Sequence, residues 1–174
     1  MYDPEEDSYL IEKHIKNYPS NSCLDVGTGS GILAKEASRY CKKVLAVDLD
    51  KEAIKHCKST IKKKNITFKV SNLFSNIKEK FDLILFNPPY LPNDPLVKDK
   101  ALDGGKKGYE IIEKFLKQAK SHLKENGKIL LIFSSLTNKE KVNELIKKNN
   151  FKFKLLEKEK HFFEEIYLYL ICSK

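Results

Sequence analysis

The chain has 174 residues, of which 41% are hydrophobic and 33% are charged. This length predicts a single domain over residues 1–174 with a sizeable core, and the composition excludes disordered, collagen-like and small disulfide-framework proteins. No apolar run approaches the roughly 18 residues of a membrane span, and the acidic N-terminus does not resemble a signal peptide. We therefore expect a cytoplasmic protein that binds no membrane.

The formal charge is +9, from 33 Lys and Arg against 24 Asp and Glu. A basic balance can indicate binding to nucleic acid. However, Arg39 is the only arginine, and specific recognition of phosphates and bases favours the planar guanidinium. Solvated lysine faces explain the excess of positive charge better than a nucleic-acid interface does, but direct binding to nucleic acid is left open.

The cysteines and histidines form no recognisable metal pattern. Cys23, Cys41, Cys57 and Cys172 contain no C-x-x-C pair, and the four histidines complete no zinc spacing. We expect no metal site and reduced, mostly buried thiols.

Apolar runs typical of strands alternate with helical patterns along the chain. In chain order we predict strand 22–26, helix 31–41, strand 43–48, helix 51–63, strands 66–70 and 81–86, a loop over 87–107, helix 109–124 ended by Asn126-Gly127, strand 128–133, helix 138–148, and strands 151–156 and 166–172. This alternation predicts a parallel sheet covered on both faces. The last two strands are joined by a short polar connection and should pair antiparallel.

A glycine-rich turn, Gly27-Thr28-Gly29-Ser30-Gly31, follows the first predicted strand. Open α/β sheets bind ligands at the carboxyl ends of their strands, and glycines let the backbone approach a ligand closely. The spacing matches neither a dinucleotide fingerprint, which would need a glycine at position 32, nor a P-loop. We expect Gly27, Gly29 and Gly31 to bind a cofactor.

Two acidic residues accompany this turn. Asp48 ends the second strand, where its carboxylate can accept hydrogen bonds from both hydroxyls of a ribose. Asp25 lies at the end of the first strand, where it could face a cationic ligand. Since the turn holds no Arg or Lys, a positively charged nucleoside is favoured, and S-adenosylmethionine fits. In the alternative interpretation the glycines only shape a turn and Asp48 caps the next helix.

The tetrapeptide Asn87-Pro88-Pro89-Tyr90 follows the fourth strand and is the most specific motif. A conjugated NH2 group is a weak nucleophile that a general base helps little, so its methylation depends on positioning and electrostatics. The Asn87 side chain and the Pro88 carbonyl, freed because Pro89 breaks the strand pairing, can each accept one N–H of the target. Tyr90 offers an aromatic face for stacking. The motif predicts methylation of a planar amine but does not separate glutamine from adenine N6 or guanine N2. Its alternative is a rigid proline turn.

Four motifs in this order resemble the HemK-like release-factor glutamine methyltransferases, and within them the compact branch of archaea and eukaryotes. They are the opening segment Tyr2–Ser8, the glycine turn Asp25–Gly31, the tetrapeptide Asn87–Tyr90 and the turn Asp103–Gly108. Asp3-Pro4-Glu5-Glu6 in the opening segment is also a good helix start. The resemblance implies a Rossmann-like class I methyltransferase, α/β, with a seven-stranded, mostly parallel sheet, an antiparallel C-terminal strand and helices on both faces.

The resemblance also implies which residues act. The expected S-adenosylmethionine contacts are Ser8, Asp25, Gly27, Gly29, Gly31, Asp48, Asn72, Leu73 and Asn87. The expected substrate contacts are Asn87, Pro88, Pro89 and Tyr90, of which Asn87, Pro88 and Tyr90 are catalytic. Position 72 is Asn where many relatives have Asp, so we expect weaker or altered binding of the adenine.

The family methylates N5 of the glutamine in the Gly-Gly-Gln loop of class I translation release factors. Because the sequence starts at the opening motif, we expect no counterpart of the helical substrate-recognition domain of bacterial relatives, and the compact branch works with a small activating subunit. The resemblance therefore implies a release factor as substrate and a heterodimer with such a subunit.

Three other functions compete with this interpretation. The runner-up is N6-adenine or N2-guanine methylation of DNA or RNA, which the tetrapeptide and the charge favour but the near absence of arginine opposes. An inactive cofactor-binding scaffold would not need Asn87–Tyr90. A lysine methyltransferase would need a base that the sequence does not reveal.

Overall fold

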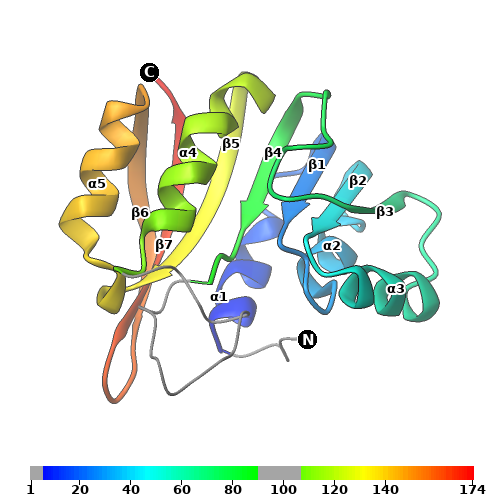
Figure 1. Cartoon of the computed structure of the whole chain (residues 1–174), viewed down its shortest axis with the longest axis horizontal. Coiled ribbons are helices and arrows are strands. Elements are labelled where there is room, and N and C mark those ends of the chain that lie inside the picture. The colour runs from blue at the N-terminus through cyan, green and yellow to red at the C-terminus, as the bar shows by residue number, and fades with distance from the viewer. Residues whose placement is uncertain (1–5, 90–106) are drawn as a thin grey trace.

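The computed structural model describes residues 6–89 and 107–174, in which seven strands form one sheet with helices packed against it (Figure 1). The strand order across the sheet is β3-β2-β1-β4-β5-β7-β6. In chain order the elements are α1 (Glu6–Ile15), β1 (Ser20–Val26), α2 (Ile32–Ala37), β2 (Cys41–Asp48), α3 (Lys51–Thr60), β3 (Ile66–Val70), β4 (Phe81–Phe86), α4 (Glu110–His122), β5 (Leu123–Ser134), the 3-10 helix η1 (Ser135–Thr137), α5 (Lys139–Lys148), β6 (Phe151–Lys160) and β7 (Glu165–Ser173).

Parallel pairing links β3, β2, β1, β4 and β5, whereas β7 runs antiparallel to both β5 and β6. This confirms the predicted mostly parallel sheet with an antiparallel C-terminal strand. Parallel neighbours need long crossovers, and α2, α3 and α4 lie in three of them. As a result, β1, β2 and β4 all end at the same edge of the sheet (Figure 1).

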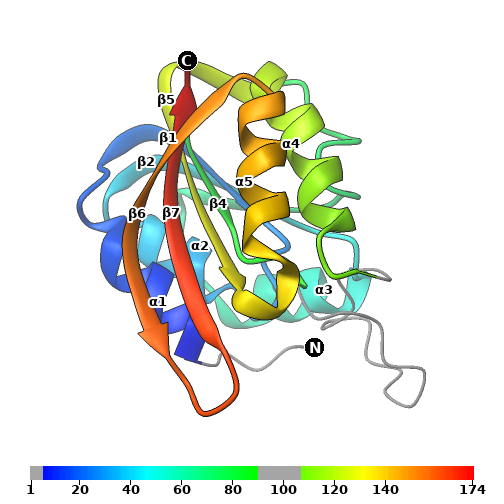
Figure 2. The same cartoon turned by 90° about the vertical axis from the view of Figure 1, so that its left-hand side faces the viewer.

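Helices lie on both faces of the sheet (Figure 2), and the two faces belong to separate hydrophobic cores. Successive side chains of a strand point to opposite faces. Leu24 and Val26 of β1 therefore pack in the core that contains α4 and α5, while Cys23 packs in the core that contains α1, α2 and α3. Burial on both faces explains why the central strands appear in the sequence as almost continuous apolar runs.

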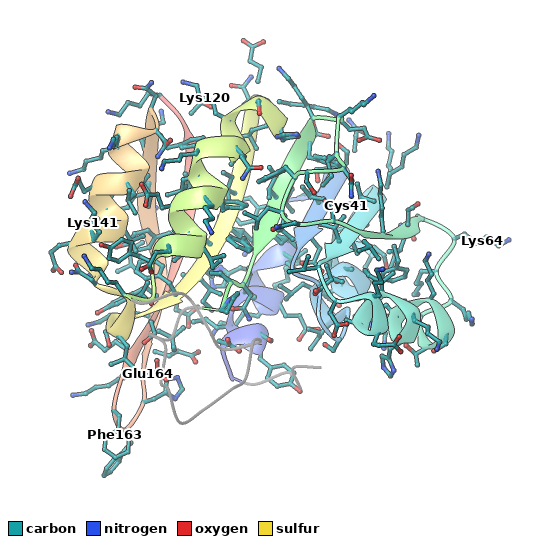
Figure 3. The ribbon with its side chains drawn as sticks, viewed as in Figure 1. Cys41, Lys64, Lys120, Lys141, Phe163 and Glu164 are labelled. Atoms are coloured by element: carbon teal, nitrogen blue, oxygen red, sulfur yellow. The ribbon has the colours of Figure 1, made fainter. Side chains whose placement is uncertain are left out.

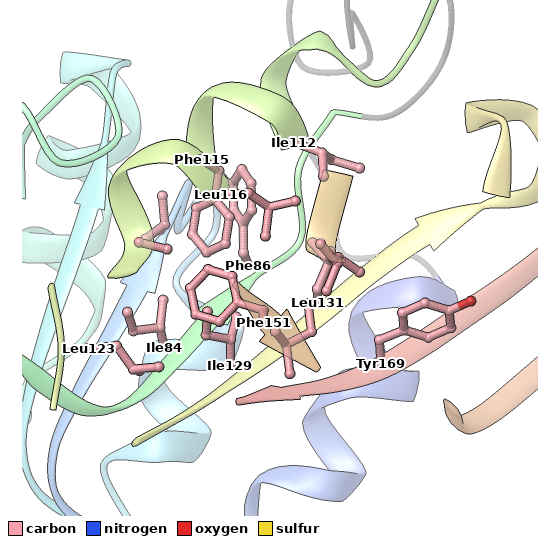
Figure 4. Packing of buried hydrophobic residues seen from close by; sticks show 14 of the residues in the cluster. Ile84, Phe86, Ile112, Phe115, Leu116, Leu123, Ile129, Leu131, Phe151 and Tyr169 are labelled. Carbon is pink, nitrogen blue, oxygen red and sulfur yellow. The ribbon is translucent and has the colours of Figure 1, made fainter. Parts of the chain in front are cut away.

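The core beneath α4 is built from aromatic and aliphatic side chains (Figure 4). The helix buries one face at helical spacing, formed by Ile112, Phe115, Leu116 and Ala119. The ring of Phe115 stacks on Phe86 of β4, with centroids 4.2 Å apart. Each such side chain contributes about 1.5–3 kcal/mol by leaving water. This packing fixes the strand that leads into residue 87.

The β6–β7 hairpin extends past the rest of the sheet (Figures 1 and 3). Its tip exposes Phe162 and Phe163, whose side chains are 93% and 86% accessible and whose rings meet edge to face at 4.7 Å. β7 itself is mostly buried, since it lies between β5 and β6. The hairpin therefore joins an inner strand to an exposed apolar tip.

The four predicted helices are all longer than those in the structure, and two of the differences have a clear cause. The helix predicted to stop at Asn126-Gly127 ends at His122, and β5 begins at Leu123, whose backbone is extended and whose side chain is buried. Asn126 has a positive φ of 62°, and the pairing of β5 with β4 shifts register between Leu123 and Lys128. The Asn-Gly pair therefore forms an irregularity inside a strand. Likewise, only residues 32–37 of the helix predicted over 31–41 are helical.

Parts of three predicted motifs fall on residues that the structure does not describe. These are the helix start Asp3-Pro4-Glu5, Tyr90 of the tetrapeptide and the turn residues 103–106; most of the predicted loop over 87–107 lies there too. From Glu6 onward α1 is helical, and it buries Leu10, Ile11 and Ile15 in the core that it shares with α2. None of the described helices is long and apolar enough to cross a membrane.

Replacing Phe115 by Ala should lower the free energy of unfolding by about 3–5 kcal/mol, because the site is fully buried between α4 and β4. Urea titration of both proteins measures this difference. Phe162→Ala is the matched control, since it removes the same atoms from an exposed position and should change stability by less than about 0.5 kcal/mol. Equal losses from the two variants would contradict this account of the core.

Candidate active site

Residues from three neighbouring strands meet at the carboxyl edge of the sheet. Val26, the last residue of β1, pairs with Val47 of β2 on one side and with Phe86 of β4 on the other. The next residues along these strands are Gly27, Asp48 and Asn87, so the register brings all three to one level. This is the position at which open α/β sheets bind ligands.

The glycine turn adopts backbone angles that other residues rarely adopt. Gly27, Gly29 and Gly31 have φ values of 68°, 52° and 82°. A Cβ atom on Gly31 would lie 2.5 Å from Ile61 Cδ1 and 2.9 Å from Cys57 Sγ, so these side chains would have to shift to admit it. A Cβ on Gly29 would meet no described atom within 4 Å. The turn is therefore packed against α3 at Gly31 and open at Gly29.

The Asp48 carboxylate links the glycine turn to the start of α3. Its Oδ2 accepts a hydrogen bond from the Gly29 N–H at 2.8 Å, and its Oδ1 accepts one from the Asp50 N–H at 2.9 Å. A carboxylate offers about four acceptor positions, so two remain for a ligand. The alternative in which Asp48 caps the next helix is wrong, because Asp50 caps α3 through the Glu52 N–H.

Asp25 is fully buried at the end of β1. Burial raises the pKa of its carboxyl to about 7, and the charge of Asp48 also raises it, while hydrogen bonds from Thr28 and the Ala34 backbone lower it in part. The Thr28 hydroxyl donates to Oδ2 at 2.6 Å, and Oδ1 makes no hydrogen bond of good geometry with the described residues. A positive charge placed near this carboxyl would favour its ionised form.

Asn87 contacts the first described helix, about 80 positions away in the sequence. Its Nδ2 atom donates to Asp7 Oδ2 at 3.1 Å and to Ser8 Oγ at 3.3 Å. Both partners lie in the first turn of α1, and their side chains are 4% and 3% exposed. The predicted cofactor residue Ser8 and the predicted catalytic residue Asn87 are therefore in direct contact.

Sequence reasoning assigned no role to Asp7, although it quoted this residue as part of the opening motif. The one indication in the sequence that Asp7 lies near the site was its position next to Ser8, a predicted cofactor contact. What the sequence could not supply is the pairing of α1 with the end of β4, because that contact depends on how the helix packs on the sheet.

The other predicted residues follow β3 and β4. The backbone N–H of Asn72 donates to Ser75 Oγ at 3.2 Å, and Leu73 has a positive φ of 50°, an uncommon value for a bulky residue. The Asn72 side chain is exposed, beyond the end of the strand next to β2. Pro88 is buried and Pro89 is partly buried. Tyr90 lies outside the described residues, so its stacking role stays a prediction.

The cysteines lie mostly in the interior. Three of the four are buried, as predicted, and Cys172 is partly buried. The Cys57 thiol donates to the Gly29 carbonyl at 3.3 Å and so helps to hold the turn. In residues 6–89 and 107–174, no three His, Cys, Asp or Glu side chains are grouped to hold a metal ion.

Comparison with known proteins gives one family and several relatives. Residues 5–164 match the family described as Methyltransferase small domain. A Methanocaldococcus jannaschii protein that is named for protein N5-glutamine methylation is 36% identical over 174 residues, 95% of this chain and 88% of that protein. The release factor glutamine methyltransferase of Buchnera aphidicola subsp. Schizaphis graminum is 35% identical over 158 residues, 82% of this chain. The chain spans only 57% of that bacterial relative.

A solved structure resembles the whole chain. It is the E. cuniculi Mtq2–Trm112 complex, described as methylating the translation termination factor eRF1. The TM-score is 0.82 at 22% sequence identity, over 99% of this chain and 98% of that chain. At this identity the likeness concerns the fold, which is the one that the sequence predicted.

The titration of Asp25 leads to a prediction about stability. The folded protein keeps this proton up to about pH 7, whereas the unfolded chain loses it near its ordinary pKa of 3.8. Between these values the folded state binds more protons than the unfolded state, so the contribution of Asp25 to the free energy of unfolding falls as pH rises.

Asp25→Asn keeps an acceptor for Thr28 and removes the titration. Its stability relative to the original protein should therefore increase from pH 4 to 7, by at most about 4 kcal/mol, because one pKa unit corresponds to about 1.4 kcal/mol. Urea titrations across this range measure the difference. Stability curves that stay parallel would contradict the buried, protonated carboxyl.

Proposed function

This chain belongs to the Methyltransferase small domain family, and from that premise we propose that it transfers a methyl group from S-adenosylmethionine to N5 of a protein glutamine. The proposed target is the glutamine in the Gly-Gly-Gln loop of a class I translation release factor. The names of its relatives from Methanocaldococcus and Buchnera support this target.

The observation that carries the proposal is the placement of Asn87. Its amide lies at the carboxyl end of β4, level with the glycine turn after β1, and hydrogen bonds to Asp7 and Ser8 hold it there. Methylating an amide requires acceptors for its N–H groups more than it requires a base, because an amide NH2 is too weak an acid to ionise first. A fixed asparagine beside the ligand edge meets that requirement.

The residues around the turn fit S-adenosylmethionine. Gly29 leaves space for close approach, and the Asp48 carboxylate keeps acceptor positions for ribose hydroxyls. The buried Asp25 carboxyl becomes a better partner for a positive charge once it ionises. Ser8, Asn72 and Leu73 are the further proposed contacts. When bound, the cofactor supplies a methyl group activated by the positive charge on its sulfur.

The chain's own residues would hold the target amide and stabilise charge. The Asn87 side chain and the Pro88 carbonyl accept the two N–H groups of the glutamine, while Pro89 and Tyr90 shape the rest of the pocket. Positive charge develops on the glutamine nitrogen as it is methylated, and both acceptors stabilise that charge. The nitrogen then loses one proton to water. No side chain has to act as the base.

The proposed partners are a release factor and a small activating subunit. The TM-score of 0.82 with the Mtq2 complex supports this assembly, since Mtq2 is paired there with Trm112. The proposed location is the cytoplasm, where release factors act. Methylation of adenine or guanine is not favoured, because the relatives described above are named for glutamine methylation.

Transfer can be followed with methyl-labelled S-adenosylmethionine, a release factor and extract from cells that lack this chain, which supplies any activating subunit. We expect label on the glutamine of the release factor, with a much lower rate when the extract is omitted. Label in nucleic acid would overturn the protein target and favour base methylation. Equal rates without extract would overturn the heterodimer.

Asn87→Ala should lower the rate of transfer by about a hundredfold or more, because it removes an acceptor for the developing charge. Calorimetry should still detect cofactor binding. Asn21→Ala is the matched control, since Asn21 is exposed in β1 near its opposite end. A rate for Asn87→Ala within about tenfold of the original protein would contradict this role.

Asp48→Ala should weaken binding of S-adenosylmethionine by about 1–3 kcal/mol, because ribose hydroxyls lose their acceptor and the Gly29 N–H loses its partner. Calorimetry measures the affinity. Asp50→Ala is the control, because it removes the cap of α3 and lowers stability by about 1 kcal/mol without removing a proposed ligand contact. Unchanged affinity in Asp48→Ala would show that Asp48 does not bind the ribose.

A further inference from the structure

Asp7 is hydrogen-bonded both to the Asn87 amide and to Ser8, the other partner of that amide. Asp7 Oδ2 accepts from Asn87 Nδ2 at 3.1 Å. Its Oδ1 accepts from the Ser8 backbone N–H at 2.6 Å and lies 3.3 Å from the Ser8 hydroxyl, which donates to it. The Ser8 oxygen in turn accepts from Asn87 Nδ2 at 3.3 Å. These three residues are therefore hydrogen-bonded to one another.

An ionised carboxylate in this set determines which way the Asn87 amide faces. A carboxylate oxygen only accepts hydrogen bonds, so the amide atom beside it has to be the NH2 group. Turning the amide over would place its oxygen 3.1 Å from Asp7 Oδ2, where two acceptors repel. Ser8 alone could not make this choice, because a hydroxyl both donates and accepts.

The hydrogen bonds to Asp7 and Ser8 also occupy both N–H donors of the Asn87 amide. The amide nitrogen has two hydrogens, and the structure provides one acceptor for each, in Asp7 and in Ser8. Ser8 is able to accept because its own hydrogen is directed to Asp7. What remains of the amide is its oxygen, which accepts no hydrogen bond from residues 6–89 or 107–174. That oxygen is the group that a target N–H requires.

We propose that Asp7 is a positioning residue for the methyl transfer, one that fixes the Asn87 amide so that Oδ1 is presented to the glutamine NH2. That glutamine is the substrate follows from the proposed function, whereas the orientation of the Asn87 amide follows from the hydrogen bonds described above. Asp7 is 4% exposed, so its hydrogen bonds form in a place where water competes little.

A carboxylate at this position has a second effect on the reaction. Hydrogen bonding to a negative group polarises the Asn87 amide and makes its oxygen a stronger acceptor. That oxygen faces the nitrogen on which positive charge develops. The negative charge of Asp7 therefore stabilises the reaction through Asn87, without touching the substrate.

A purely structural role is the alternative. Asp7 lies in the first turn of α1, where a negative side chain stabilises any helix. Loss of that stabilisation would lower stability and could change activity indirectly. The experiment therefore needs readouts that a weakened helix would not produce.

Asp7→Asn removes the charge and keeps the shape, and Glu12→Gln is the matched control on the same helix. With wild-type activating extract, S-adenosylmethionine and the release factor, Asp7→Asn should lower kcat by about tenfold or more, while KM changes by less than about threefold. Glu12→Gln should change neither. A kcat for Asp7→Asn within about threefold of wild type overturns the proposal. An increase in KM that accounts for the whole loss of kcat/KM also overturns the proposal.

The side-chain amide of Asn87 provides a readout that needs no substrate. In a spectrum of the 15N-labelled chain its NH2 signals are identified by their absence in Asn87→Ala. We expect them to exchange slowly with water in the wild type, and to shift and exchange faster in Asp7→Asn but not in Glu12→Gln. Unchanged signals in Asp7→Asn overturn the proposal. If the wild type methylates no glutamine, the proposed function fails, and this spectrum still decides whether Asp7 positions Asn87.

Discussion

Parallel pairing of β1, β2 and β4 is the constraint on which the site depends. Strands that run in one direction end at one edge, so a turn, a carboxylate and an amide that lie far apart in the sequence become neighbours. The register is fixed because these strands are buried on both faces, and a slip by one residue would exchange every side chain between the two cores. The geometry of the site is therefore a property of the whole sheet.

Two further supports hold the groups at that edge. On one side Cys57 of α3 and Ile61, the residue after this helix, pack against the glycine turn, and Asp48 ties the turn to β2. On the other side α1 reaches the end of β4 through its first turn, where Asp7 and Ser8 are buried. Residues on strand ends are held more rigidly than residues on long loops. Rigidity of this kind suits a reaction that depends on positioning.

The sequence predicted the central strands and the glycine turn well, because buried parallel strands appear as apolar runs and the turn needs glycines. The end of α4 was missed, because Asn126-Gly127 serves as a stop signal for a helix and equally as an irregularity in a strand. Burial of Leu123 decides between these uses, and a local pattern does not report burial. Asp7 was missed for a related reason, since its role depends on a tertiary contact with Asn87.

The position of β7 inside the sheet affects how the chain folds while it is being synthesised. This strand is the last of the described strands to leave the ribosome, yet it lies between β5 and β6. Until it emerges, β5 has an open edge and β6 has no strand to pair with. Open edges invite pairing with other chains. A nascent chain that stalls before residue 165 is therefore exposed to aggregation, even though its glycine turn and Asn87 have already been made.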